Sequence, residues 1–187
     1  MPVTVSPTTF QFVDYDAALI ERVASELLDA LGMADHDLLV EVDETTPLAK
    51  VDIGLDPLVV GVQSGAFEDT RQPRHQSESA TVTALGRALL RARDRLSGGF
   101  GDAPPDHELT LAQTAAWEAY CVGRLERLGV STNVQRWRYN FRNRHGFHDA
   151  GDAVFDRIWA SDGLTWAGLC ELSRAAGADD GAATVKI

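Results

Sequence analysis

The chain has 187 residues, of which 44% are hydrophobic and 24% are charged, and its formal net charge is −11. The length and composition exclude a disordered or fibrous chain, and they allow a core to form without disulfides or a structural metal. The negative charge argues against a nucleic-acid partner, because the summed field of an acidic protein repels a phosphate backbone.

The first predicted elements are a short edge strand and a helix. Residues 9–13 alternate weakly, with two phenylalanines on one side, which is typical of a strand. After this segment, apolar side chains recur at helical spacing as far as Leu31, and Gly32 follows where a helix end favours a left-handed residue. A helix is therefore predicted over residues 16–32.

Three segments that alternate with period two come next, at residues 38–42, 49–53 and 58–62. Turn-rich breaks separate them, so they predict a small antiparallel meander of three strands, or of four with the edge strand. Residues 64–76 have no periodicity and predict a surface loop. An apolar stripe then predicts a second helix over residues 78–97.

The second half of the chain predicts further helices. Residues 98–106, which are rich in glycine and proline, form the most linker-like stretch. An apolar stripe predicts a helix over residues 109–128, and two short helices are expected at residues 152–160 and 164–176. The tail of small residues, 177–187, is expected to be flexible.

These elements predict an α+β fold in a single domain over residues 1–176. The antiparallel meander is expected to pack against several α-helices, with the first three helices covering one of its faces. Cys121 and Cys170 lie within helical patterns beside apolar neighbours. Both are therefore expected to be buried, reduced thiols.

The segment 136–144 alternates arginine or asparagine with aromatic residues for most of its length. As a strand, it would place its arginines on one face and its aromatic residues on the other. As a helix ending at Gly146, it would turn Trp137 and Phe141 inward and spread the arginines around the exposed arc. Either form could bind a phosphate, a carboxylate-bearing ligand, single-stranded nucleic acid or an acidic protein partner. In the structural alternative, the arginines pair with carboxylates of their own chain. The candidate binding residues are Arg136, Trp137, Arg138, Tyr139, Arg142 and Arg144.

The predicted loop 64–76 is the second candidate site, because loops between packed elements often carry binding residues. Its mixture of acids, bases and an imidazole could supply acid–base chemistry to an anionic substrate, and a solvated connection is the alternative. The candidates are Arg71 and Arg74 to orient an anion, and Glu68, Asp69 or His75 as a general acid or base.

Histidines provide a third hypothesis. His145 and His148 lie close to carboxylates in the sequence, and together with His75 they are candidate ligands for a divalent metal. A glycine interrupts the His-x-x-His spacing at a predicted turn. The alternative is that Asp149 or Asp152 caps the next helix.

The predicted order of helix, three strands, loop and long helix resembles the core topology of zincin-type metallopeptidases. Residues 83–89 read Thr-Ala-Leu-Gly-Arg-Ala-Leu, which is similar to a zincin helix that reads His-Glu-Leu-Gly-His-Ala-Leu. Thr83, Ala84 and Arg87 stand where the two zinc-binding histidines and the water-activating glutamate would be. The resemblance therefore implies a non-catalytic relative that lacks the zinc site.

The sequence contains no phosphate loop, serine-hydrolase elbow, Cys-x-x-Cys pair or calcium loop. The leading hypothesis is a non-catalytic binding or regulatory module, without a cofactor, for a small anionic ligand or an acidic protein partner. The alternatives are a small metal-assisted hydrolase using His, Asp and Glu residues, and a zincin-like protein without its zinc site. No apolar run approaches the roughly 20 residues of a membrane-spanning helix and no export signal is visible, so a cytoplasmic monomer or homo-oligomer is expected.

Overall fold

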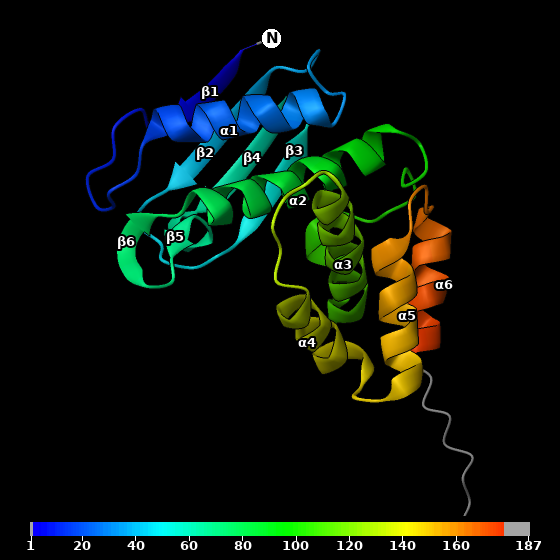
Figure 1. Ribbon diagram of the computed structural model, residues 1–187. Coiled ribbons are helices and arrows are strands. Elements are labelled where there is room, and N and C mark those ends of the chain that lie inside the picture. Colours follow the sequence, from blue (N-terminus) through cyan, green and yellow to red (C-terminus); the bar gives the residue numbers. More distant parts are fainter. Residues whose placement is uncertain (1, 178–187) are drawn as a thin grey trace, which may run out of the picture. The chain divides into compact units, whose positions relative to one another are not determined.

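The computed structural model describes residues 2–177 and contains six α-helices and two β-sheets in that range (Figure 1). The described chain divides into two compact units. Residues 2–101 and 125–131 form the sheet unit, and residues 102–124 and 132–177 form the helical unit. The α+β class is confirmed, whereas the assignment of one domain stays a prediction.

The larger sheet has four strands in the order β1-β2-β4-β3. Its strands are β1 (Val3–Ser6), β2 (Leu38–Asp43), β3 (Val51–Leu55) and β4 (Leu58–Gln63). β3 and β4 pair antiparallel as expected, but β2 pairs in parallel with both β1 and β4. The prediction of a purely antiparallel meander is therefore wrong. β4 lies beside β2 in the centre of the sheet and buries every second side chain. β3 lies at the edge of the sheet and has no fully buried side chain.

Helices α1 (Ala17–Ala30) and α2 (Glu78–Leu96) lie side by side across one face of this sheet (Figure 1). Each begins at a side chain that accepts a hydrogen bond from the first turn, Asp16 for α1 and Ser77 for α2. Alternate valines and leucines of β1, β2 and β4 are buried, as are the apolar stripes of both helices. The predicted helices in this part of the chain are confirmed.

The segment 64–76 contains regular structure. A 3-10 turn at Ser64–Ala66 precedes a two-stranded antiparallel sheet of β5 (Glu68–Asp69) and β6 (Gln72–Gln76). The loop prediction is wrong here because backbone pairing, rather than side-chain periodicity, defines such short strands. The edge strand predicted at residues 9–13 is also wrong, since the N-terminal strand is β1.

The helical unit contains a 3-10 turn and four helices, the first of them in part. These elements are η2 (Asp106–Glu108), α3 (Leu111–Arg127), α4 (Val134–His145), α5 (Asp149–Ala160) and α6 (Trp166–Gly177). α4, α5 and α6 pack against one another. Gly123 of α3 lies against α5, because a Cβ at this position would be 2.2 Å from the carbonyl oxygen of Trp159. The predicted helices of this region are confirmed.

The last residues of α3 belong to the sheet unit. Leu125 is fully buried, and a Cβ added to Gly86 of α2 would lie 2.7 Å from its Cδ2 atom. The sequence predicts that the whole helix 109–128 covers the sheet, and this packing stays a prediction. Its residues as far as Arg124 belong to the helical unit.

The predicted states of the cysteines and the tail are only partly tested. Cys121 is buried, whereas Cys170 is half-buried, and both are free thiols. Gly177 ends α6, and residues 178–187 of the predicted tail lie outside the described residues. Among residues 2–177, no helix is long and apolar enough to cross a membrane.

Candidate functional site

The arginine-rich segment forms helix α4, so the helical interpretation is confirmed and the strand interpretation is wrong. Asn133 caps the start of α4 by accepting a hydrogen bond from the Arg136 N–H at 3.1 Å. Gly146, with a φ of 101°, ends the helix. Trp137 and Phe141 are buried, and the arginines occupy the rest of the helix surface.

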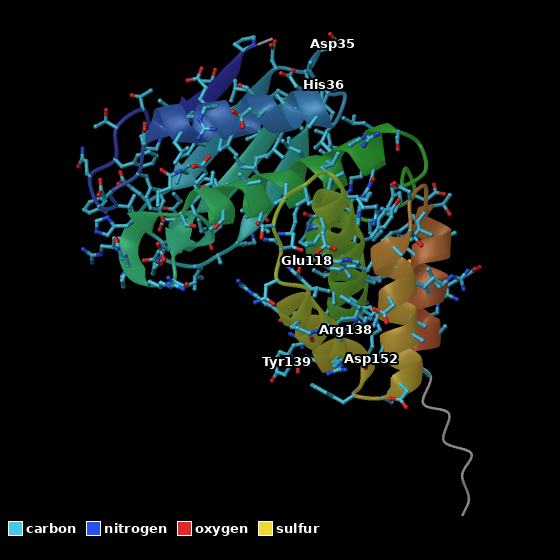
Figure 2. All side chains as sticks on the ribbon, in the orientation of Figure 1. Asp35, His36, Glu118, Arg138, Tyr139 and Asp152 are labelled. Atoms are coloured by element: carbon cyan, nitrogen blue, oxygen red, sulfur yellow. The ribbon has the colours of Figure 1, made fainter. Side chains whose placement is uncertain are left out.

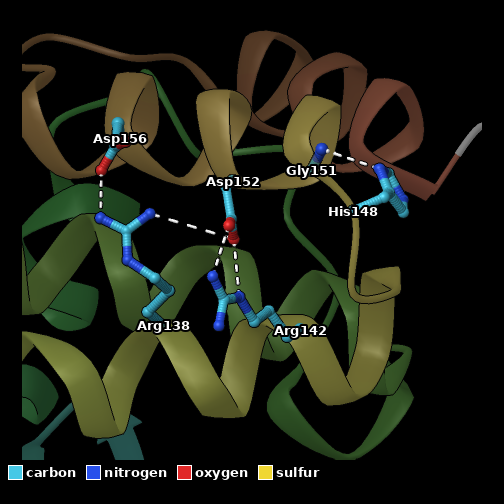
Figure 3. Close-up of polar contacts among 6 residues, drawn as sticks. All are labelled: Arg138, Arg142, His148, Gly151, Asp152 and Asp156. Atoms are coloured by element: carbon cyan, nitrogen blue, oxygen red, sulfur yellow. Dashed lines mark hydrogen bonds and ion pairs between the residues drawn. The ribbon is translucent and has the colours of Figure 1, made fainter.

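Two arginines of α4 already have carboxylate partners on α5 (Figure 3). Nε of Arg142 donates to Oδ1 of Asp152 at 2.7 Å, and its Nη2 donates to the other carboxylate oxygen. Arg138 donates to Asp156, and its guanidinium lies 4.6 Å from the centre of the Phe155 ring. Hydrogen bonds from Arg142 hold the pKa of Asp152 below its usual value. Arg138 and Arg142 therefore join two helices, as the structural alternative proposed.

Arg136 and Tyr139 lie on the exposed side of α4. Arg136 has no carboxylate partner among residues 2–177, and its guanidinium lies 5.9 Å from the centre of the Trp137 ring. Tyr139 is 58% exposed and points away from the Arg138–Asp152 contact, and its ring meets that of Phe147 edge-on (Figure 2). Such exposure is typical of an open surface rather than of an enclosed ligand site.

The three candidate metal ligands lie in different units. His75 is in the sheet unit, whereas His145 and His148 are in the helical unit. Nδ1 of His148 accepts a hydrogen bond from the Gly151 N–H at 3.0 Å, so a histidine makes the α5 cap that was expected from an aspartate (Figure 3). Within residues 2–177, no group of three or more His, Cys, Asp or Glu side chains could hold a metal ion.

Arg71 and Arg74 lie on the β5–β6 hairpin of the sheet unit. The Arg71 N–H donates to Oδ1 of Asp69 at 2.8 Å, which shapes the turn. Arg74 borders a pocket of about 300 Å³ together with Glu44 and Glu68. Two carboxylates and one guanidinium make this pocket unfavourable for an anion.

A pocket of about 460 Å³ in the helical unit has the opposite charge balance. Its lining comes from the start of α3 and the ends of α4 and α6, namely Thr110, Ala112, Gln113, Arg144, His145, Cys170, Ser173, Arg174 and Gly177. Arg144 and Arg174 are exposed, and neither has a carboxylate partner among residues 2–177. None of the lining residues is acidic, in a chain that contains 28 aspartates and glutamates. We call it the basic pocket.

The first turn of α3 adds polar groups to the basic pocket. Oγ1 of Thr110 accepts from the Gln113 N–H at 3.2 Å, and Oε1 of Gln113 accepts from the Thr110 N–H at 2.9 Å. The Ala112 N–H has no acceptor within the helix, because it belongs to the first turn. Nε2 of Gln113 donates to Sγ of Cys170 at 3.7 Å, which joins α3 to α6.

His145 and Ser173 form a hydrogen-bonded pair in the wall of the basic pocket, and each is only 5% exposed. Nδ1 of His145 lies 3.1 Å from the Phe141 carbonyl oxygen and must carry a proton to donate to it. In the neutral ring, Nε2 then accepts from Oγ of Ser173 at 2.9 Å. Burial lowers the pKa of His145, so the neutral ring predominates at pH 7.

The candidate residues predicted from the sequence include Arg144 and His145 of the basic pocket, but neither Ser173 nor Arg174. A partial signal was present, because these two residues follow Cys170 by three and four positions and so share one face of a helix. No local pattern, however, predicts that this face meets the end of α4.

Searches of protein-family models, curated proteins and solved structures found no match to the chain. The segment 83–89, which carries the zincin resemblance, lies within α2, and Ala84 of this segment is buried. Function is therefore inferred from the geometry of the helical unit.

Proposed function

We propose that the helical unit binds a small anionic ligand, with a carboxylate or phosphate group, in the basic pocket. The observation that carries this proposal is that Arg144 and Arg174 line one pocket without an acidic residue. The arginines in the middle of α4 are neutralised by aspartates of α5. At the end of α4 no such partner is present among the described residues, so an external anion can take that place.

The chemistry of the lining groups supports an anion in particular. A guanidinium group presents its donors in a planar fork that fits two oxygens of a carboxylate or phosphate. Ala112 lines the pocket in the first turn of α3, at the positive end of the helix dipole, where anions are stabilised. The uncharged polar side chains of Thr110 and Gln113 can orient the rest of the ligand.

The size of the basic pocket favours a small molecule over an acidic protein surface. Sites for small ligands typically have volumes of about 300–1,000 Å³. The basic pocket, at about 460 Å³, lies within this range. A metabolite-sized anion is therefore the better match of the two partners that the sequence suggested.

Titration calorimetry with inorganic phosphate, and separately with succinate, tests the proposal at pH 7.5 and constant ionic strength. Arg144→Gln and Arg174→Gln should each weaken binding of the preferred anion about tenfold or more. A hydrogen bond to a charged group contributes about 1.5–3 kcal/mol, which corresponds to a change of that size.

Arg136→Gln is the matched control, because it removes the same charge from the same helix at a position outside the basic pocket. Its affinity should stay within about twofold of the wild type, as expected for a screened surface charge. Equal weakening in all three variants would indicate a general charge effect and would contradict the proposal. So would a wild-type chain that binds neither anion.

A further inference from the structure

We infer that the basic pocket is also a hydrolytic site, in which Ser173 attacks the acyl carbon of an ester and His145 serves as the general base. The ester that fits best carries a free carboxylate or phosphate group. This inference rests on the proposed function, because Arg144 and Arg174 would hold the anionic group of the substrate. It adds a reaction, acyl transfer to water, to the binding of an anion.

The geometry contains the three parts of an activated serine. Oγ of Ser173 lies 2.9 Å from Nε2 of His145, which is hydrogen-bond distance for proton transfer. The other ring nitrogen is held by the Phe141 carbonyl oxygen at 3.1 Å, which sets the tautomer with a free electron pair on Nε2. The imidazole also stacks on the Phe141 ring, with centroids 3.9 Å apart, so the orientation of the base is fixed.

The position of this pair in the fold favours reaction over a purely structural role. Ser173 and His145 come from different helices and are 95% shielded from solvent, yet both belong to the lining of the basic pocket. A substrate in the pocket can therefore reach them. The same burial favours the uncharged imidazole, which is the form that accepts a proton.

The reaction proceeds in two steps, acylation of the serine and hydrolysis of the acyl-serine. Oγ of Ser173 forms a bond to the acyl carbon while its proton moves to Nε2 of His145. The tetrahedral intermediate then expels the alcohol, which takes that proton as it leaves. In the second step, a water molecule gives a proton to the same nitrogen and attacks the acyl carbon of the acyl-serine. Oγ of Ser173 takes that proton as its bond to the acyl carbon breaks, and the carboxylic acid is released. One water is consumed, and no oxidant or cofactor is needed.

The developing oxyanion also needs donors. Such donors usually contribute much of the rate enhancement in acyl transfer, because they stabilise charge that forms only in the transition state. Ala112 lines the basic pocket in the first turn of α3, where backbone N–H groups have no acceptor within the helix, and its N–H is the donor that we assign to this role. The cationic side chains of the lining reinforce it electrostatically.

Two chromogenic esters test the inference on the intact chain. 4-Nitrophenyl acetate is neutral and needs no anion anchor, whereas mono-4-nitrophenyl succinate carries a free carboxylate. Both should release 4-nitrophenol, and the acceleration over each ester's own uncatalysed rate should be at least tenfold greater for the succinate ester, whose carboxylate also attacks its own acyl carbon in free solution. Mass spectrometry after acid quenching should locate the acyl group on Ser173 of the wild type. Because this measurement uses no variant, it does not depend on whether a substituted chain folds.

Variants and pH provide the second set of measurements. Ser173→Ala should abolish acylation, and His145→Gln should slow it about 10²- to 10⁴-fold, as expected for loss of a general base. Arg136→Gln should react like the wild type. Acylation should rise with pH along a limb centred below about 6.5, the usual pKa of histidine, because burial lowers that of His145. A merely structural histidine would produce no such limb.

The two proposals can fail separately. Acylation on Cys170, or no acylation by either ester, would overturn the hydrolytic inference even if calorimetry shows phosphate or succinate in the basic pocket. Acylation of Ser173 without a preference for the succinate ester would support the serine and histidine roles but overturn the anionic substrate class. Failure of the anions to bind would be seen independently by calorimetry.

Discussion

Asp152 organises the charges between α4 and α5. Its carboxylate accepts hydrogen bonds from Arg142 and lies 3.9 Å from the guanidinium of Arg138, which also pairs with Asp156. Arg138 and Arg142 therefore both have carboxylate partners within their own chain. Their pairing also predicts how the helical unit responds to acid.

Asp152→Asn should lower the thermal midpoint of unfolding at pH 7, because two guanidinium groups lose a charged partner. The pKa of Asp152 is lowered in the folded chain, so its stabilisation is present above the unfolded pKa of about 4. The stabilisation is lost as the pH falls through the lower, folded pKa. Unfolding curves between pH 7 and pH 2 should thus converge for the two chains in acid.

Glu171→Gln is the control for this comparison, because Glu171 is an exposed carboxylate of α6 with no ion pair among the described residues. Its midpoint should follow that of the wild type at every pH. A constant difference between Asp152→Asn and the wild type down to pH 2 would show that the loss is steric rather than ionic.

At the scale of elements, Gly123 allows α3 and α5 to approach closely. The position that a Cβ would occupy lies 2.2 Å from the Trp159 carbonyl oxygen, and this obstacle is backbone rather than a flexible side chain. One helix must therefore shift if any other residue replaces this glycine.

Gly123→Ala should destabilise the chain by about 1–3 kcal/mol, the usual range for overpacking a tight contact. Gly168→Ala is its matched control in α6, since a Cβ there would meet only Oγ1 of Thr165 at 3.4 Å. The control should be neutral or should gain up to about 1 kcal/mol from helix propensity. Urea unfolding measures both. Equal stability of the two variants would contradict the close contact.

Helices and strands with a clear apolar period could be predicted from the sequence, whereas the elements against which they pack or pair could not. The stripe of α2 identified a helix correctly, because burial of one helix face leaves a local pattern. Strand order depends on which strand fills the centre of the sheet, so the parallel pairing of β2 with β4 left no local signal. In residues 136–144, alternation and helical spacing coincide, and only packing against α5 distinguishes them. The basic pocket was missed for the same reason, since Arg144 and Arg174 meet only in three dimensions.

For the whole molecule, the net charge of −11 means that the acidic side chains of the folded chain repel one another and lower its stability. Salt shortens the range of this repulsion, from about 30 Å at 0.01 M to about 8 Å at 0.15 M. The midpoint of thermal unfolding at pH 7.5 should therefore rise with sodium chloride over this range.

The same titration near pH 4.8, the isoelectric point of the sequence, is the control. With no net charge to screen, added salt should leave the midpoint unchanged or lower it by weakening ion pairs. A fall in the midpoint with salt at pH 7.5 would mean that specific ion pairs outweigh the overall repulsion.

The path of the chain through its two units has consequences for its synthesis and its evolution. The backbone leaves the sheet unit after residue 101, returns at residue 125 and leaves again after residue 131. On the ribosome, which delivers the N-terminal part first, the sheet unit is complete only when residue 131 has emerged. By then residues 102–124 have been made without α4, α5 or α6 to cover them. No single break in the chain separates the two units. Recombination that exchanged one unit for another would therefore need several crossover points in the gene at once.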